Sequence, residues 1–182
     1  FAVYHQRYST NTFPTWSLAQ PFRVLAHNGE INTLKGNLNW MKAHETRITD
    51  DFFGDRVEDL RPILDSDASD SASLDAAFEI LLQTDRSLPM TKSMIIPESW
   101  SNNNDMPDEL KKMYAYCNAV IEPWDGPAAV CANFGDWIIS GMDRNGLRPL
   151  RYIITGDDLL ISGSEVGMVI VDDRNILKKG RV

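Results

Sequence analysis

Three stretches of the chain carry the hydrophobic spacing of amphipathic helices. Residues 70–84 place apolar side chains at i, i+3, i+4, i+7 and i+8, which is one face of an α-helix, and Asp70 stands where an N-cap belongs. Residues 107–122 repeat this pattern, with Pro107 at the first helical position. A third helix is predicted over residues 31–45.

Short β-rich runs precede and follow these helices. Two strands are predicted near the N-terminus, over residues 1–9 and 21–29. After the last helix, Gly, Asp and Asn turns separate further runs that predict a meander of antiparallel strands: 126–134, 136–143, 150–155, 158–164 and 166–172. Residues 88–100 fit either a short helix or a strand. This order predicts an α+β fold with helices packed on a largely antiparallel sheet.

Length and composition limit the architecture and the class of partner. The chain has 182 residues, enough for one domain, and no repeat or linker divides residues 1–182. A net charge of −8 without a basic patch disfavours nucleic acid as a partner, and no apolar run is long enough to span a membrane. With only two cysteines, a disulfide framework is excluded and a cytoplasmic location is expected.

The given sequence does not begin with methionine. The first residue is Phe1, and the segment that follows lacks the layout of a signal peptide. It has the pattern of a strand that is cut open, so we expect an internal fragment of a longer protein.

Several kinds of catalytic site are disfavoured by the residues present. Cys117 and Cys131 lie in apolar segments, where cysteine usually acts as a small hydrophobic residue. His5, His27 and His44 lack metal-binding spacing, so no metal site is predicted. Glycine-rich phosphate loops are absent, which disfavours an ATPase or a dinucleotide enzyme.

The remaining candidates are polar residues at turns. Arg7 opens a Ser/Thr/Asn-rich loop, and a guanidinium can grip a carboxylate bidentately. Asn28 and Gly29 end a predicted strand and could offer an amide NH₂ and a backbone N–H to an oxyanion. Asp70 could act only as a helix cap or could bind an ammonium group. Together these groups suit an α-amino acid with a reactive carbonyl.

The amino-acid sequence of these segments resembles a known family along nearly the whole chain. The segments "HQRYSTNTFPTWSLAQPFRVLAHNGEINTLKGN", "DSASLD", "IIPESW", "IEPWDGPAA" and "MDRNGLRPLRY", followed by "SGSEVG", resemble the class II glutamine amidotransferase domain of glutamate synthases. The resemblance implies an Ntn-hydrolase-like αββα sandwich, with two mainly antiparallel sheets between helical layers. Residues 1–182 would be the C-terminal part of that domain.

The resemblance also implies a role for each polar candidate. Arg7, helped by Thr10, would hold the α-carboxylate of glutamine, and residues 8–16 would close over the substrate. Asn28–Gly29 would form the oxyanion hole. Asp70 would pair with the α-ammonium group, a role that is compatible with a helix cap.

The nucleophile of this family is absent from the chain. In the family the nucleophile is the N-terminal cysteine, whose α-amino group serves as general base. Its thiolate attacks the glutamine amide, which releases ammonia and leaves a glutamyl thioester that water then hydrolyses. Neither Cys117 nor Cys131 fits that role, so the nucleophile is expected upstream and this fragment alone is expected to be inactive. Two departures from the family pattern, in "ANFGDW" and at Gly163 of "SGSEVG", are expected to lie away from the glutamine pocket.

Cofactors and partners follow only from the resemblance. Ammonia would pass to a synthase domain of the same chain, which aminates and reduces 2-oxoglutarate to glutamate. FMN, an iron–sulfur cluster and electrons from NADPH, NADH or ferredoxin would serve that domain, with a small NADPH-oxidising subunit as a further partner. No cofactor is expected within this fragment.

Two alternatives stay open at this stage. One is another class II amidotransferase, serving phosphoribosylamine, glucosamine 6-phosphate or asparagine synthesis, although "EPWDGPA" and "DRNGLRP" argue against it. The other is an inactive amidotransferase-like domain that only binds an amino acid or a protein.

Overall fold

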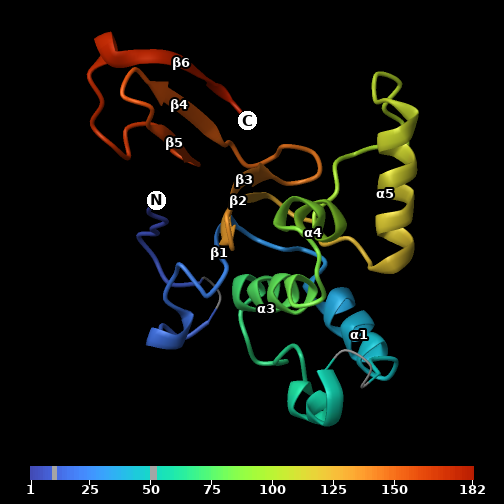
Figure 1. The fold of residues 1–182 in the computed structure, drawn as a ribbon. Coiled ribbons are helices and arrows are strands. Elements are labelled where there is room, and N and C mark those ends of the chain that lie inside the picture. The colour runs from blue at the N-terminus through green and yellow to red at the C-terminus, as the bar shows by residue number, and fades with distance from the viewer. Residues whose placement is uncertain (10–11, 50–52) are drawn as a thin grey trace.

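The computed structural model describes residues 1–9, 12–49 and 53–182. Figure 1 shows two separate sheets, with the helices gathered around the first of them. The helices are α1 (Leu34–Glu45), α3 (Asp70–Leu82), α4 (Leu88–Ile95) and α5 (Asp108–Val120). Short 3₁₀ helices are η1 (Trp16–Leu18), η2 (Gly54–Leu60) and η3 (Asp173–Asn175).

Both sheets are antiparallel and three-stranded. The first has the order β1-β2-β3, formed by β1 (Leu25–Gly29), β2 (Ala128–Phe134) and β3 (Trp137–Met142). The second has the order β5-β4-β6, formed by β4 (Arg151–Thr155), β5 (Leu160–Gly163) and β6 (Ile176–Arg181). The α+β class with two antiparallel sheets is therefore confirmed.

The hydrophobic core lies between the first sheet and the helices. Helix α3 contacts β1, α4 contacts β2 and β3, and α5 packs on α4. Fully buried side chains from these elements fill the space, among them Leu25, Leu74, Phe78, Met94 and Val130. Burying such large apolar side chains stabilises the layer by about 1.5–3 kcal/mol each.

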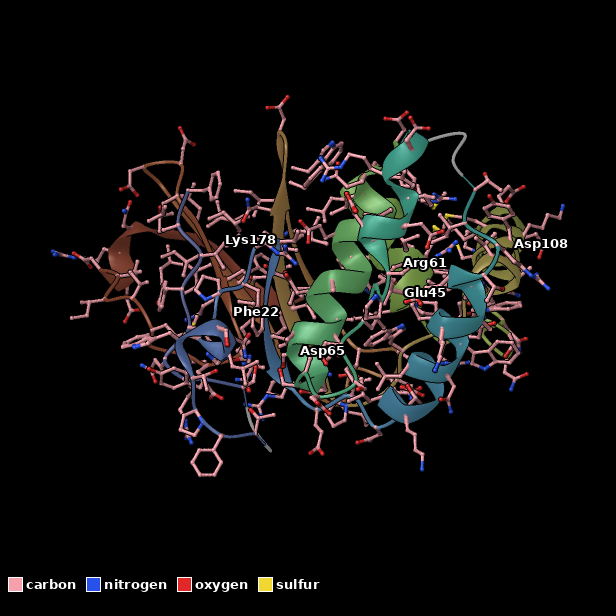
Figure 2. The ribbon with its side chains drawn as sticks, turned by 90° about the horizontal axis from the view of Figure 1, so that it is seen from below. Phe22, Glu45, Arg61, Asp65, Asp108 and Lys178 are labelled. Atoms are coloured by element: carbon pink, nitrogen blue, oxygen red, sulfur yellow. The ribbon has the colours of Figure 1, made fainter. Side chains whose placement is uncertain are left out.

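The long connection between α1 and α3 is tied back to the end of α1. The Glu45 carboxylate accepts the backbone N–H of Ile63 at 2.6 Å, and the Arg61 guanidinium donates to the carbonyl of Ile48 at 3.3 Å. Figure 2 shows Glu45 and Arg61 together on this side of the molecule. These contacts fix the path of the chain into α3.

Two predicted strands, at residues 1–9 and 166–172, are absent, and one strand, β6, was not predicted. Residues 1–9 form only an isolated bridge, between Tyr8 and Ala19, because the His5 ring binds the backbone of Arg7 and bends the segment. Residues 166–172 form turns, and the edge position beside β4 is taken by β6, which was not predicted because its Lys-rich pattern is mostly exposed.

Helix positions are closer to the prediction. The N-cap of α3 is Ser69, whose hydroxyl accepts the N–H of Ala72, so Asp70 is the first helical residue rather than the cap. Pro107 is the N-cap of α5 rather than its first residue, because its ψ of 144° is extended. Residues 88–95 adopt the helical alternative, with a proline in the first turn.

Candidate functional site

Helix α3 holds β1 in place through two buried carboxylates. Asp75 accepts the backbone N–H groups of Val24 at 2.9 Å and Leu25 at 3.0 Å, where β1 begins. Asp70 accepts the N–H of Ile31 at 2.8 Å, just after β1 ends. Because both ends of the strand are bound to one helix, the end of β1 has a fixed position relative to Asp70.

Asp70 also faces a small cavity. The cavity measures about 140 Å³ and is lined by Asp70, Thr12 of the Ser/Thr-rich loop, and Glu30, Ile31, Leu34, Ala68 and Ser69. A carboxylate offers about four acceptor positions. Among the described residues, Asp70 accepts the Ile31 N–H and the Ser71 hydroxyl, and its Oδ2 lies 4.0 Å from Nδ1 of His27. The group therefore keeps acceptor capacity for a cation at the start of α3.

Asn28 and Gly29 lie at the end of β1, as predicted. The amide Nδ2 of Asn28 donates to the Ser164 hydroxyl at 2.8 Å. Gly29 has a φ of +154°, and a Cβ at this position would lie 1.8 Å from the carbonyl oxygen of Pro127. Only glycine fits there, so the backbone turn that follows Asn28 depends on it.

His27 connects this turn to Asp70. Its Nδ1 lies 2.8 Å from the Ser71 hydroxyl, which donates to Asp70 at 3.3 Å. Because a hydroxyl has one hydrogen to give, the ring donates from Nδ1. Burial lowers the pKa of His27, and the charges of His5 and Arg148 lower it further. Asp70 and the Pro127 carbonyl favour the protonated ring, but their effect on the pKa is smaller than that of burial.

This lowered pKa predicts a pH-dependent stability. The unfolded chain binds a proton at His27 near pH 6.5 and the folded chain only at lower pH, so stability is lost as pH falls below about 6.5. Unfolding midpoints between pH 7 and pH 5 should fall less steeply for His27→Gln than for wild type. His44→Gln is the control, since that ring pairs with Glu122 at a partly exposed site. An unchanged slope in His27→Gln would contradict the assignment.

Arg7 and the loop that follows it make few contacts among the described residues. Its guanidinium is exposed and has no hydrogen-bond or ion-pair partner among the described residues. His5, two residues earlier, lies close enough for its charge to act on His27. Thr10 falls outside the described residues. The loop ends at the Tyr8–Ala19 bridge, and within it the rings of Tyr8 and Trp16 lie 5.9 Å apart.

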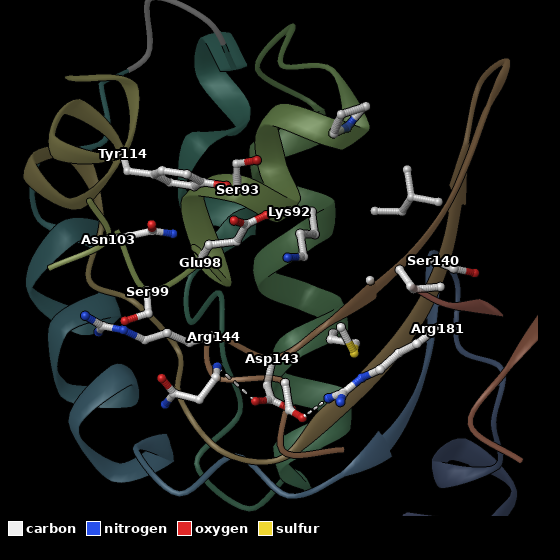
Figure 3. A pocket seen from close by; sticks show the side chains of 17 residues that line it. Lys92, Ser93, Glu98, Ser99, Asn103, Tyr114, Ser140, Asp143, Arg144 and Arg181 are labelled. Carbon is white, nitrogen blue, oxygen red and sulfur yellow. Dashed lines mark hydrogen bonds between the residues drawn. The ribbon is translucent and has the colours of Figure 1, made fainter. Parts of the chain in front are cut away.

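A larger cavity, of about 770 Å³, lies elsewhere, between α4, α5 and the end of β3 (Figure 3). Lys92 and Tyr114 line it. Burial lowers the pKa of Lys92 despite the nearby Glu98 and Asp143, and burial raises the pKa of Tyr114. None of the predicted site residues lines this cavity, so it is separate from the cavity at Asp70.

The charged "DRNGLRP" segment is organised around the carboxylate of its first residue, Asp143. Burial alone would raise its pKa, but the backbone N–H groups of Arg148, Ala128, Leu147 and Asn145 donate to the carboxylate and lower the pKa below its usual value. The segment is thus a loop folded around one carboxylate.

The cysteines behave as predicted from their apolar surroundings. Cys117 is fully buried, and burial raises the pKa of its thiol. Cys131 lies in β2 with its sulfur 3.2 Å from the Ser140 hydroxyl. A reactive cysteine needs a stabilised thiolate, and Cys117 has the opposite environment.

Two features are absent from the described residues. Among them, no helix is both long enough and apolar enough to cross a membrane. Within the same residues, His, Cys, Asp and Glu side chains form no group that could hold a metal ion.

Comparison with known proteins identifies the family. The model of the class-II glutamine amidotransferases matches residues 1–182. The chain belongs to the class-II glutamine amidotransferases. The "NADPH" glutamate synthase large chain of Azospirillum brasilense is 57% identical over 182 residues, and that of Bacillus subtilis is 48% identical. The ferredoxin-dependent glutamate synthase of Pyropia yezoensis is 48% identical over 184 residues.

These relatives are much longer than this amidotransferase chain. Each match covers 100% of the chain but only 12% of the relative. A solved structure of glutamine phosphoribosylpyrophosphate amidotransferase from B. subtilis aligns with 97% of the chain and 34% of its own, at 18% identity and a TM-score of 0.43.

Two residues of the candidate site were not identified from the sequence. Ser71 connects His27 to Asp70, and its place directly after Asp70 could have suggested it. Ser164 binds Asn28 and directly follows Gly163, so the departure at Gly163 lies one residue from a contact of the candidate site. No local signal links Ser164 to Asn28, because 136 positions separate them.

Proposed function

We propose that this chain supplies the glutamine-binding part of a glutaminase site in a glutamate synthase. The observation that carries the proposal is the connection between Asp70, with its spare acceptor capacity at a small cavity, and the Asn28–Gly29 turn, through His27 and Ser71. The names of the relatives support this choice within the family. Residues 1–182 would form a single domain, the C-terminal part of the amidotransferase domain.

The proposed site binds glutamine at both ends. Arg7, with Thr10, holds the α-carboxylate, and Asp70 holds the α-ammonium group. Asn28 Nδ2 and the Gly29 N–H then face the side-chain carbonyl oxygen. When a thiolate attacks the amide carbon, negative charge moves onto that oxygen, and the two donors stabilise it.

In this proposal, the nucleophile is a cysteine that is not among these 182 residues. Its thiolate forms the bond to carbon, the C–N bond breaks, and ammonia leaves after gaining a proton. Water then hydrolyses the thioester to glutamate. The 182-residue chain by itself is accordingly expected to be inactive.

In the whole protein, ammonia would reach a synthase domain that converts 2-oxoglutarate to glutamate. FMN and an iron–sulfur cluster would carry electrons there from NADPH, NADH or ferredoxin, with a small NADPH-oxidising subunit in one version. A cytoplasmic location belongs to the same proposal.

Replacing Arg7 tests the carboxylate grip. In the full-length protein, Arg7→Met should raise KM for glutamine by about 10- to 100-fold with little change in kcat, because a charged hydrogen-bonded pair contributes about 1.5–3 kcal/mol. The KM of Arg7→Lys should fall between those of wild type and Arg7→Met, since lysine keeps the charge without the bidentate geometry. Steady-state glutamate release measures both.

Arg23→Met is the matched control for Arg7. Arg23 is exposed, and its guanidinium pairs with Glu79 at 2.8 Å and with Asp75 at 3.9 Å rather than with a proposed glutamine ligand, so its loss should leave KM unchanged. An Arg7→Met protein with the wild-type KM would refute the assignment of the carboxylate to this residue.

A further inference from the structure

The hydrogen bond between Asn28 and Ser164 joins the two sheets at the proposed oxyanion hole. Asn28 lies in β1 of the first sheet, and Ser164 directly follows β5 of the second. Nδ2 of Asn28 donates to Oγ of Ser164 at 2.8 Å. The donor side chain of the first sheet is therefore bound by the residue that directly follows a strand of the second.

This contact restricts the Asn28 amide in a specific way. The terminal torsion of an asparagine side chain is broad and roughly two-fold, so the amide needs an external partner to hold one orientation. The NH₂ group has two hydrogens. When one points at Ser164, the amide plane is set, and the second hydrogen remains available for a substrate oxygen.

Ser164 is itself held on both sides. Gly163, before it, pairs with Arg151 in the second sheet. Glu165, after it, lies 3.3 Å from the guanidinium of Arg148, whose backbone N–H donates to Asp143. A fixed acceptor of this kind can hold a donor within the tolerance that a reacting group requires.

We propose that Ser164 is a positioning residue for Asn28 in glutamine hydrolysis. It rests on the proposed function and adds to it the residue that aims the oxyanion donor. The Ser164 hydroxyl accepts one Nδ2 hydrogen and turns the other toward the developing negative charge. Its contribution appears in the transition state and not in substrate binding.

The test uses the full-length protein with glutamine as substrate. Ser164→Ala should lower kcat by about 10-fold and leave KM within about twofold, because the oxyanion donor is misoriented rather than removed. Ser164→Thr keeps the hydroxyl and should restore most of kcat. Ser162→Ala is the matched control, since Ser162 lies two residues earlier, in β5, and its buried hydroxyl has no hydrogen-bond partner among the described residues.

A double-mutant cycle distinguishes positioning from loosening of the fold. In an Asn28→Ala background, Ser164→Ala should cause no further loss of kcat, because the group that it aims is gone. If the wild type is active, three results would overturn the inference about Ser164 but not the proposed function. These are an unchanged kcat in Ser164→Ala, the same loss of kcat when Ser164→Ala is made in the Asn28→Ala background, and an equal loss of kcat in Ser162→Ala. A wild type that does not hydrolyse glutamine would overturn the proposed function and the inference with it.

Discussion

Replacing Asn28 with alanine is expected to lower kcat for glutamine hydrolysis by about 100- to 1,000-fold while KM stays nearly constant. The amide of Asn28 lies at the end of β1, where one of its hydrogens is bound to Ser164, and in the proposed site the other faces the substrate. That second hydrogen gains strength only when the carbonyl oxygen becomes negative, so its loss affects the transition state rather than the bound substrate. The measurement is steady-state glutamate release by the full-length protein.

Asn39→Ala provides the matched control for Asn28. Asn39 is exposed on α1, so its replacement should leave both constants unchanged. If Asn28→Ala instead raises KM and keeps kcat, Asn28 contacts the bound substrate and is not an oxyanion donor.

The second large effect is expected at Asp70. Asp70→Asn should lower kcat/KM for glutamine by at least about 30-fold, because losing one partner of a buried charge pair costs about 2 kcal/mol or more. The variant should also discriminate less between glutamine and glutaramate, which lacks the α-amino group. Both effects follow from an ammonium group bound at the start of α3. Competition kinetics with the two substrates in the full-length protein measures them.

An exposed aspartate close by controls for charge alone. Asp67 lies three residues before Asp70 on the surface, and Asp67→Asn should behave as wild type. Unfolding midpoints show whether Asp70→Asn still folds, since Asp70 also accepts the Ile31 N–H. A folded Asp70→Asn protein that keeps the wild-type preference for glutamine would exclude Asp70 as the ammonium ligand.

Much of the helical layer could be predicted because its signals are local. The apolar spacing over residues 70–84 corresponds to α3, and the turn residues Asn28 and Gly29 lie at the end of β1. The cap was assigned one residue too late, since Ser69 and Asp70 are both good N-cap residues and only the backbone distinguishes them.

The missed features depend on pairing between distant segments. Residues 166–172 are as apolar as a strand, but the place beside β4 is taken by β6, whose pattern is more polar. The strand expected at residues 1–9 is absent, and Tyr4 instead donates from its hydroxyl to the Met168 carbonyl at 3.2 Å. Ser164 reaches Asn28 only because the second sheet meets the first at this point.

The most direct test of the glutamine-binding account is a crystal structure of the full-length protein with glutamate bound. We predict that the α-carboxylate lies on the guanidinium of Arg7 and the α-ammonium group on Asp70. The side-chain carboxylate should lie within hydrogen-bonding distance of Asn28 Nδ2 and the Gly29 N–H. Glutamate bound elsewhere, for example in the cavity beside Lys92 and Tyr114, with Asp70 keeping only its protein contacts, would contradict the account.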